Sequence, residues 1–240
     1  MRQLQRALSL IYPDQCVVCE TRVEEQGGLC GPCWRETPFL TGLLCHACGA
    51  SLPGHEEDAT FCDDCMVMVR PWHMGRAAMA YRDAGRRIVL SLKHGDRLDL
   101  VPPTARWMAR AGRQFLTPGT VLVPVPVHWT RLLTRRYNQA AELARAIGRE
   151  ANLTVMPDAL LRTKRTPPQD GMTVDQRFAN LTGAFQPNPK CAGQLLGRQV
   201  CLVDDVMTSG ATLTLATEAL HSAGASQVCV LTLARVEKAP

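Results

Sequence analysis

Two adjacent carboxylates, Asp204 and Asp205, stand at the end of a short apolar run, residues 200–203. The length of that run and its β-branched residues predict a buried strand. Small and hydroxylated residues follow, and an apolar pattern with helical spacing begins at Leu213. Gly224 stands where the cap at the end of that helix is expected. The predicted order is therefore strand, acidic pair, loop and helix.

The loop between the acidic pair and the helix has the composition of an anion-binding site. Backbone N–H groups at a helix N-terminus attract anions, and hydroxyl groups donate further hydrogen bonds. Gly210 lets the backbone approach the ligand closely, and the lack of a lysine after it excludes a Walker-type nucleotide loop. The residues of this predicted site are Val206, Met207, Thr208, Ser209, Gly210, Ala211 and Thr212.

The acidic pair restricts which anion could bind beside it. Asp204 and Asp205 would repel a bare phosphate, but they can accept hydrogen bonds from a diol or act together with Mg²⁺. A sugar phosphate meets both requirements. The alternative is a generic strand, turn and helix with two solvated aspartates. The apolar run, the acidic pair, the loop and the helix start follow one another in the order that a ligand site needs, which favours the ligand site.

Eight of the eleven cysteines form four Cys-x-x-Cys pairs before residue 66. Two such pairs supply the four thiolates of one tetrahedral Zn²⁺ site, so these cysteines predict two closed structural sites. Sequential pairing closes the shortest loops and costs the least chain entropy, while a cross-braced arrangement stays open. Reduced buried thiols and a redox role for one pair are the alternatives. The predicted zinc ligands are Cys16, Cys19, Cys30, Cys33, Cys45, Cys48, Cys62 and Cys65.

The remaining elements must position these groups. Leu4, Leu8 and Ile11 predict a short amphipathic helix over residues 1–13 that packs on the cysteine-rich module. Residues 162–180 contain two adjacent prolines and show no apolar periodicity, and we expect a long mobile loop there. The other predicted elements are strands over residues 75–81, 121–126 and 228–233 and helices over residues 88–94, 101–115 and 137–149.

The distribution of charged and apolar residues indicates which part of the chain could bind DNA and whether the chain enters a membrane. Residues 1–70 hold 5 basic and 10 acidic residues, whereas residues 71–240 hold 22 and 12, so the cysteine-rich part is not expected to grip DNA. No signal peptide and no run of 18 apolar residues is present, which predicts a cytoplasmic protein without membrane insertion. In that compartment the cysteine pairs favour metal binding over disulfides.

Taken together, these features resemble the ComF/GntX family across essentially the whole chain. The resemblance rests on the four cysteine pairs, Val-Pro-Val-Pro at 123–126, Arg-Arg-Tyr-Asn-Gln at 135–139, and the Lys-Arg-Thr segment that begins at Lys164. The stretch at 200–212 is similar to the signature with which type I phosphoribosyltransferases hold phosphoribosyl pyrophosphate (PRPP). Arg136 departs from the pattern, because the family usually has glycine there, and it could occupy part of the pocket.

The resemblance implies an α/β fold: the open, mostly parallel sheet of the type I phosphoribosyltransferases with flanking helices, preceded by a small double zinc-ribbon module. It also implies two domains. Residues 1–70 would form the N-terminal helix and the double zinc ribbon, and residues 71–240 the phosphoribosyltransferase-like domain.

Roles for individual residues follow from the same resemblance. Residues 206–212 would cradle the 5-phosphate of PRPP, and Asp204 and Asp205 would hold its ribose hydroxyls. Arg131, Arg135 and Arg136 follow the strand at 121–126, where the resemblance puts the pyrophosphate, and arginine forks suit phosphate oxygens.

Two further elements of the family complete the expected site. Lys164 and Arg165 lie on the loop that in such enzymes closes over the ligand and excludes water. Mg²⁺ would bridge the departing pyrophosphate. Thr208 stands where some purine-specific enzymes have an aspartate base, so the sequence names no acceptor.

Two functions remain open at this point. The first is PRPP-dependent phosphoribosyl transfer to an unidentified acceptor with release of pyrophosphate, linked through the family to DNA uptake in natural transformation. The second is a non-catalytic, PRPP-responsive module that handles single-stranded DNA beside the uptake machinery. The basic residues between Arg131 and Arg165, with Trp129 and Tyr137, would suit a strand of nucleic acid or a polyphosphate equally well.

Overall fold

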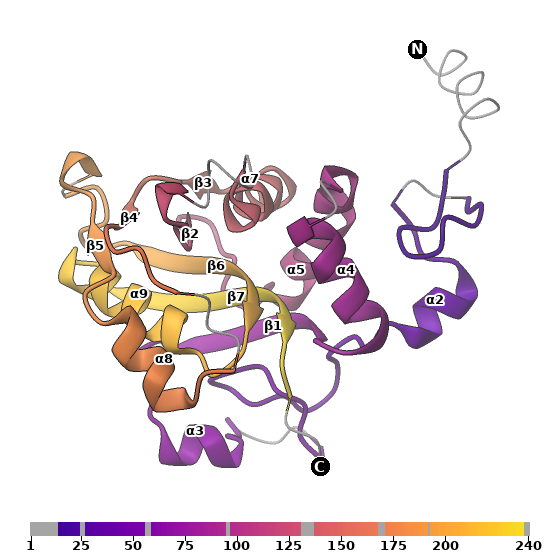
Figure 1. The fold of residues 1–240 in the computed structure, drawn as a ribbon, viewed down its shortest axis with the longest axis horizontal. Coiled ribbons are helices and arrows are strands. Elements are labelled where there is room, and N and C mark those ends of the chain that lie inside the picture. The colour runs from indigo at the N-terminus through magenta and orange to yellow at the C-terminus, as the bar shows by residue number, and fades with distance from the viewer. Residues whose placement is uncertain are drawn as a thin grey trace.

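The computed structural model describes residues 14–24, 27–55, 59–94, 97–130, 137–167, 171–191 and 193–237. The predicted helix over residues 1–13 and the three arginines at 131, 135 and 136 lie outside these ranges. Within them, one parallel sheet carries helices on both of its faces, and two small cysteine-rich ribbons adjoin it (Figure 1).

The central sheet has five parallel strands in the order β1-β7-β6-β2-β3. Their bounds are β1 Met74–Ala80, β2 Val121–Pro124, β3 Thr154–Val155, β6 Gln199–Met207 and β7 Gln227–Arg235. Strand β6 lies between β7 and β2, and its residues 200–203 and 207 are buried. The predicted parallel α/β fold is therefore what the chain adopts.

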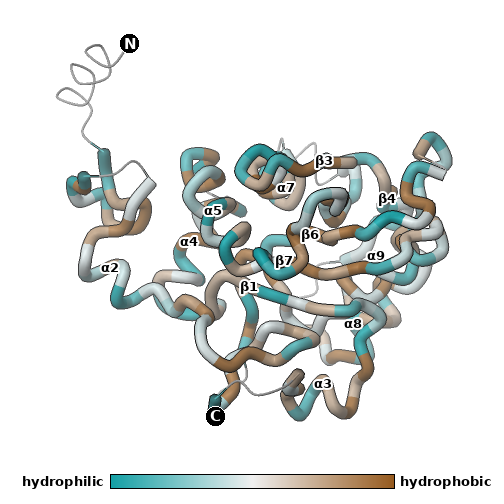
Figure 2. Tube along the Cα trace, turned by 180° about the vertical axis from the view of Figure 1, so that it is seen from behind, coloured by the Kyte–Doolittle hydropathy of each residue, from teal (hydrophilic) through white to brown (hydrophobic). Residues whose placement is uncertain are grey.

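The two faces of the sheet carry different helices. Helices α4 (Asp83–His94), α5 (Val101–Ala111) and α7 (Gln139–Ala151) pack on one face through residues such as Leu92, Met108 and Leu143. Helix α9 (Ala211–Ser222) packs on the other face with the small antiparallel sheet of β4 and β5. The hydropathy colours of Figure 2 follow this arrangement, with apolar stretches where the strands cross the centre of the molecule.

The first ribbon surrounds Cys16, Cys19, Cys30 and Cys33 and includes helix α2 (Gly31–Glu36). It lies at the periphery, beside α4, where Arg87 of α4 forms a 2.8 Å ion pair with Glu36. Figure 1 shows α2 at the far end of the molecule from β4 and β5.

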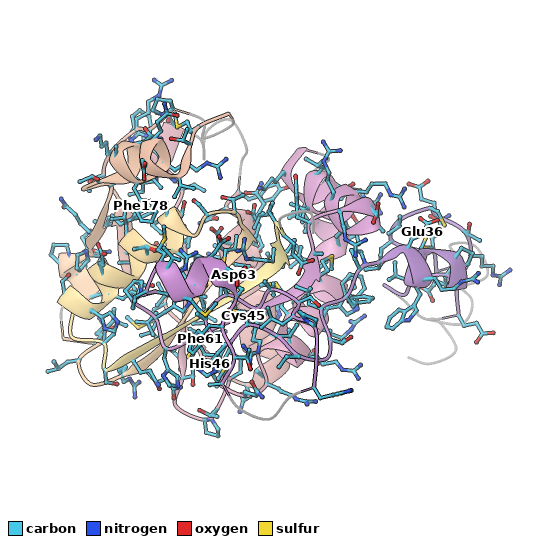
Figure 3. All side chains as sticks on the ribbon, turned by 90° about the horizontal axis from the view of Figure 1, so that it is seen from below. Glu36, Cys45, His46, Phe61, Asp63 and Phe178 are labelled. Carbon is cyan, nitrogen blue, oxygen red and sulfur yellow. The ribbon has the colours of Figure 1, made fainter. Side chains whose placement is uncertain are left out.

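The second ribbon surrounds Cys45, Cys48, Cys62 and Cys65 and includes helix α3 (Asp63–Val67). It lies along the sheet: the N–H of Gly75 in β1 donates to the carbonyl of His46, and the N–H of Leu40 donates to that of Ala78. Its Ala47, Cys48 and Cys65 pack into the same core as α9. Figure 3 shows Cys45, His46, Phe61 and Asp63 gathered in this ribbon, while Glu36 of α2 is remote from them.

Two predictions about local structure are wrong. Residues 162–180 do not form one long loop, because helix α8 (Val174–Leu181) begins at a capping box between Thr173 and Gln176. This helix lies between β4 (Leu160–Arg162) and β5 (Phe185–Pro187), which pair with each other. Strand β6 also continues through the acidic pair to Met207, so only residues 208–210 separate it from α9.

No helix in the described part of the chain is long and apolar enough to cross a membrane.

Gly75 of β1 is a position where the second ribbon approaches the sheet closely. A Cβ atom added there would lie 2.2 Å from the carbonyl oxygen of Ala47 and 3.0 Å from a methyl group of Val230. We therefore expect Gly75→Ala to lower the free energy of unfolding by about 1–3 kcal/mol, the usual cost of overpacking. Gly31→Ala is the matched control, because a Cβ there meets no atom within 4 Å. Chemical denaturation checks this, and equal stability of the two variants would contradict the close approach.

Candidate functional site

The candidate site lies at the carboxyl ends of β2 and β6, where the connections leave on opposite faces of the sheet. The connection after β2 leads to α7 on one face, and the connection after β6 leads to α9 on the other. Ligands of open α/β sheets bind in the crevice that such a reversal leaves. The 2.8 Å hydrogen bond from the N–H of Val125 to the carbonyl of Val203 joins the two strand ends.

The acidic pair lies within β6 at this edge. Neighbouring strand residues point to opposite faces, and Asp205 accordingly meets Lys93 of α4 at 3.2 Å, on the face that carries α4. Asp204 belongs to the opposite face, and its carboxylate accepts a hydrogen bond from the N–H of Asp205 at 2.9 Å. The two carboxylates therefore meet different surroundings.

The pKa of Asp204 is raised to about 7. Burial is the main cause, and the charge of Asp205 adds to it, while the positive charges of Lys93 and Arg162 oppose it. A carboxyl group with this pKa changes its charge near neutral pH, so its ionisation responds readily to a diol or a cation that binds next to it.

The turn over residues 208–210 brings several backbone N–H groups to one place. Gly210 is the N-cap of α9 and has a φ of +86°, a conformation that favours glycine. The N–H groups of Thr212 and Leu213 lie in the first helical turn and have no intrahelical acceptor. Among the described residues no acceptor is found for the N–H groups of Thr208, Ser209 and Gly210 either. The turn can therefore donate to an anion, as α9 begins there.

Two arginines hold the opposite side of this turn. Nη1 of Arg235 donates to the carbonyl oxygen of Thr208 at 2.5 Å, and Nη1 of Arg70 donates to that of Ser209 at 2.8 Å. The pattern around Asp204 gives no sign of these partners, because Arg70 lies 139 positions away from Ser209 in sequence.

The start of α7 borders the site from the side of β2. Asn138 caps the helix by accepting from the N–H of Ala140, and its amide donates to the carbonyl of Val125. The hydroxyl of Tyr137 donates to the carbonyl of Leu92, next to Lys93. Gln139 is buried, and in the described part of the chain its Nε2 has no acceptor. Gln139 is thus a further candidate hydrogen-bond donor to a ligand, and the sequence alone did not predict this role.

The eight paired cysteines form two separate groups in which the ligand atoms lie within 4.8 Å of one another. The grouping is sequential, with the first pair beside the second and the third beside the fourth. Four sulfurs at about 2.3 Å from a tetrahedral ion would be nearly 4 Å apart, and the 3.5 Å between Cys19 and Cys30 and the 3.6 Å between Cys48 and Cys62 are close to that spacing. Both groups therefore fit structural Zn²⁺, which would fix the folds of the ribbons.

Two further predicted site residues do not contact the turn at residues 208–210. Lys164 and Arg165 are exposed on the segment after β4, and no contact within the described ranges joins them to the turn. Lys93 and Arg162, which the sequence analysis did not select, are the cations whose charges act on the acidic pair.

Comparison with known protein families gives two matches. Residues 7–66 match the model of the double zinc ribbon domain, and residues 139–239 match that of the phosphoribosyl transferase domain. The first match contains all eight paired cysteines, and the second runs from the start of α7 to beyond the end of β7.

Similar proteins span nearly the whole chain. Competence protein F of Haemophilus influenzae is 26% identical over 92% of this chain and 96% of its own length. DNA utilization protein YhgH of Escherichia coli K12 is 27% identical over 94% of this chain and 99% of its own. Among solved structures, an allosteric regulatory enzyme of purine biosynthesis aligns with a TM-score of 0.41 and 14% identity, over 60% of this chain and 30% of that chain.

The raised pKa of Asp204 predicts a pH-dependent stability. Because the folded pKa of about 7 exceeds the usual 3.8, folding takes up a proton between these values, and stability falls as the pH rises through that window. Asp204→Asn should therefore stabilise the protein at pH 8 and have little effect at pH 4. Urea denaturation at both pH values measures this.

Asp99→Asn is the control for that experiment. A hydrogen bond from Arg97 lowers the pKa of Asp99, so neutralising Asp99 should destabilise the protein at pH 8, if it has any effect. Asp204→Asn variants that are less stable than the native chain at pH 8 would contradict the burial of the Asp204 charge.

Proposed function

We propose that this chain, in which a double zinc ribbon precedes a phosphoribosyl transferase domain, binds PRPP with Mg²⁺ at the carboxyl end of β6. The observation that carries the proposal is the juxtaposition of the acidic pair with a turn whose N–H groups have no acceptor in the described residues. The turn would hold the 5-phosphate, and Asp204 and Asp205 would accept from the ribose hydroxyls. Residues 206–212 form this binding segment.

The pyrophosphate would lie toward the segment after β2, which contains Arg131, Arg135 and Arg136. Lys164 and Arg165 would approach from the segment after β4 when the ligand is bound. Arg162 and Lys93, whose charges act on Asp204, would support the same cluster of negative charge. This set favours transfer by positioning and electrostatic stabilisation of the departing pyrophosphate, without a dedicated base. The proposed reaction is phosphoribosyl transfer to an unidentified acceptor.

The relatives suggest the process that this activity serves. Competence protein F and DNA utilization protein YhgH match nearly all of the chain, and their names refer to competence and to the use of DNA. We therefore propose that the PRPP site serves the uptake or use of DNA, in a protein that the sequence predicts to be cytoplasmic.

PRPP binding is tested by the stability that it adds. A ligand that binds only the folded state adds about 2.7 kcal/mol at a hundredfold excess over its dissociation constant. In Asp204→Asn, Asp205→Asn the stabilisation by PRPP and Mg²⁺ should disappear. The control is Glu150→Gln, Asp175→Asn, which removes the same charge from two exposed positions. Thermal unfolding with and without PRPP and Mg²⁺ measures the effect. If the ligand still stabilises the Asp204→Asn, Asp205→Asn variant, the proposed site is rejected.

Turnover needs a separate measurement. Release of pyrophosphate on adding nucleobases or single-stranded DNA would support transfer to an acceptor. PRPP binding without any release would favour the PRPP-responsive module.

A second candidate function is the handling of single-stranded DNA, and a specific groove favours it. The groove has a volume of about 420 Å³ and lies between the segment at residues 39–44, with Trp34 of α2 beside it, and β1 and α5. Trp34, Phe39 and Trp107 form a continuous aromatic strip along it, with ring centroids 4.8 and 5.3 Å apart. Aromatic faces beside cations bind single strands by stacking and charge.

The charge of this groove supports the same ligand. Arg110 and Arg113 line it, no acidic side chain does, and neither arginine has an ion pair within the described residues. The basic residues between Arg131 and Arg165, with Trp129 and Tyr137, were predicted to suit either a nucleic-acid strand or a polyphosphate. There, the hydroxyl of Tyr137 is engaged with Leu92, and Trp129 remains 64% exposed.

Tryptophan substitutions distinguish the two surfaces. If DNA lies in the α5 groove, Trp34→Ala should weaken the binding of a single-stranded oligonucleotide by about 1–3 kcal/mol, the cost of one lost base stack. Trp129→Ala serves as the matched exposed tryptophan and should have no effect. Arg110→Ala should in addition reduce the slope of affinity against salt by about one unit if it contacts a phosphate. Fluorescence anisotropy at several salt concentrations measures both, and a loss only in Trp129→Ala would move the strand to the segment after β2.

A further inference from the structure

Two guanidinium groups, those of the buried Arg235 and the half-buried Arg70, lie between the second cysteine cluster (Cys45, Cys48, Cys62 and Cys65) and the turn at residues 208–210. Arg235, the last residue of β7, has Nη2 3.9 Å from the sulfur of Cys48 and Nη1 2.5 Å from the carbonyl oxygen of Thr208. Arg70, just after α3, donates from Nη1 to the carbonyl oxygen of Ser209 at 2.8 Å and lies 3.3 Å from the sulfur of Met68. Arg235 therefore contacts both a cysteine of the cluster and a carbonyl of the turn, and Arg70 contacts the turn from the segment that follows Cys62 and Cys65.

The geometry of the peptide group links these carbonyl contacts to anion binding. In a trans peptide the C=O and the following N–H point in opposite directions. The carbonyls of Thr208 and Ser209 belong to the same peptide groups as the N–H donors of Ser209 and Gly210. When the arginines hold the carbonyls toward the ribbon, both N–H groups point away from it, to the side where an anion would bind.

The packing behind the turn leaves it little freedom to adopt another orientation. A Cβ atom added to Gly210 would lie 2.8 Å from Nη1 of Arg70 and 3.3 Å from the ring of Trp72. Trp72 in turn donates from Nε1 to the carbonyl of Ala47, between Cys45 and Cys48. The Arg70 guanidinium lies 5.5 Å from the centroid of the Trp72 ring, so these two side chains form one layer between ribbon and turn.

We propose that Arg70 and Arg235 are positioning residues that couple the metal-loaded second cysteine cluster to the orientation of the Ser209 and Gly210 amides, and thereby to phosphate binding. Four thiolates and one Zn²⁺ carry a net charge of about −2. Such a cluster attracts the two guanidinium groups and keeps them in place to orient the turn. The coupling rests on the proposed PRPP site, because it concerns the segment that would hold the 5-phosphate.

The first test compares affinities for ribose 5-phosphate by calorimetry on the full, zinc-loaded chain. Arg70→Met keeps the apolar stem and removes the fork, and we expect the dissociation constant to rise about tenfold, the effect of one lost charge-assisted hydrogen bond. Arg70→Lys should recover part of the affinity, because it keeps the charge. Arg82→Met is the control, since Arg82 is exposed and pairs with Asp83. Equal affinities of the native chain and of Arg70→Met, with two zinc ions in each, would overturn the proposal.

The second test needs no bound ligand. The order parameters of the Ser209 and Gly210 N–H vectors, measured by NMR relaxation, should fall in Arg70→Met and in Cys62→Ser, which opens the second cluster, while those of β6 stay unchanged. If the native chain fails to bind ribose 5-phosphate, the proposed function falls and the coupling is still decided by these order parameters. Unchanged order parameters in a Cys62→Ser protein that has lost one zinc ion would sink the coupling alone. If Cys62→Ser does not fold, Arg70→Met and Arg70→Lys decide by the same measurement.

Discussion

The pairing of β6 with both β2 and β7 is the constraint on which the rest of the structure depends. It buries residues 200–203 completely and brings the acidic pair, which follows directly, to the carboxyl edge of the sheet. Because the chain leaves β2 and β6 toward opposite faces, α7 and α9 begin on either side of one crevice. The same pleat sends Asp205 toward Lys93 and Asp204 toward the other face, so each carboxyl group acquires its own electrostatic surroundings.

The two ribbons have the same ligand pattern and different relations to the domain. The first contacts the helical layer through Val17, which is buried in the core on that side of the sheet, and through the exposed Glu36–Arg87 pair. The second shares backbone hydrogen bonds with β1, contributes Ala47, Cys48 and Cys65 to a core cluster, and reaches the turn at 208–210 through Arg70. A domain boundary at residue 70 therefore describes the order of modules along the chain. In space, the second ribbon is part of the packing of the sheet.

Local patterns in the sequence predicted most of the helices and strands. They could not predict contacts between residues that are distant in the sequence. The strands at 121–126 and 228–233 and the start of α7 at Asn138 follow from apolar runs and from helix capping, which neighbouring residues decide. Helix α8 was missed although signals were present, since Thr173 and Gln176 have capping-box spacing and Val174, Phe178 and Leu181 share a face. The roles of Lys93, Arg70 and Arg235 could not be predicted, because each depends on how separate elements pack together.

The contact between the second ribbon and β1 has a further consequence for the molecule in solution. β1 is the outermost strand on its side of the sheet, and an uncovered edge strand offers its free N–H and C=O groups to any other extended chain. Residues 38–46 cover that edge: the N–H groups of Ala80 and Gly75 donate to Pro38 and His46, and Phe39 forms a bridge with Met79. At the opposite edge β3 is only two residues long. The zinc-binding fold thus also protects the sheet from self-association, and a chain that loses metal from this ribbon is exposed to aggregation through β1.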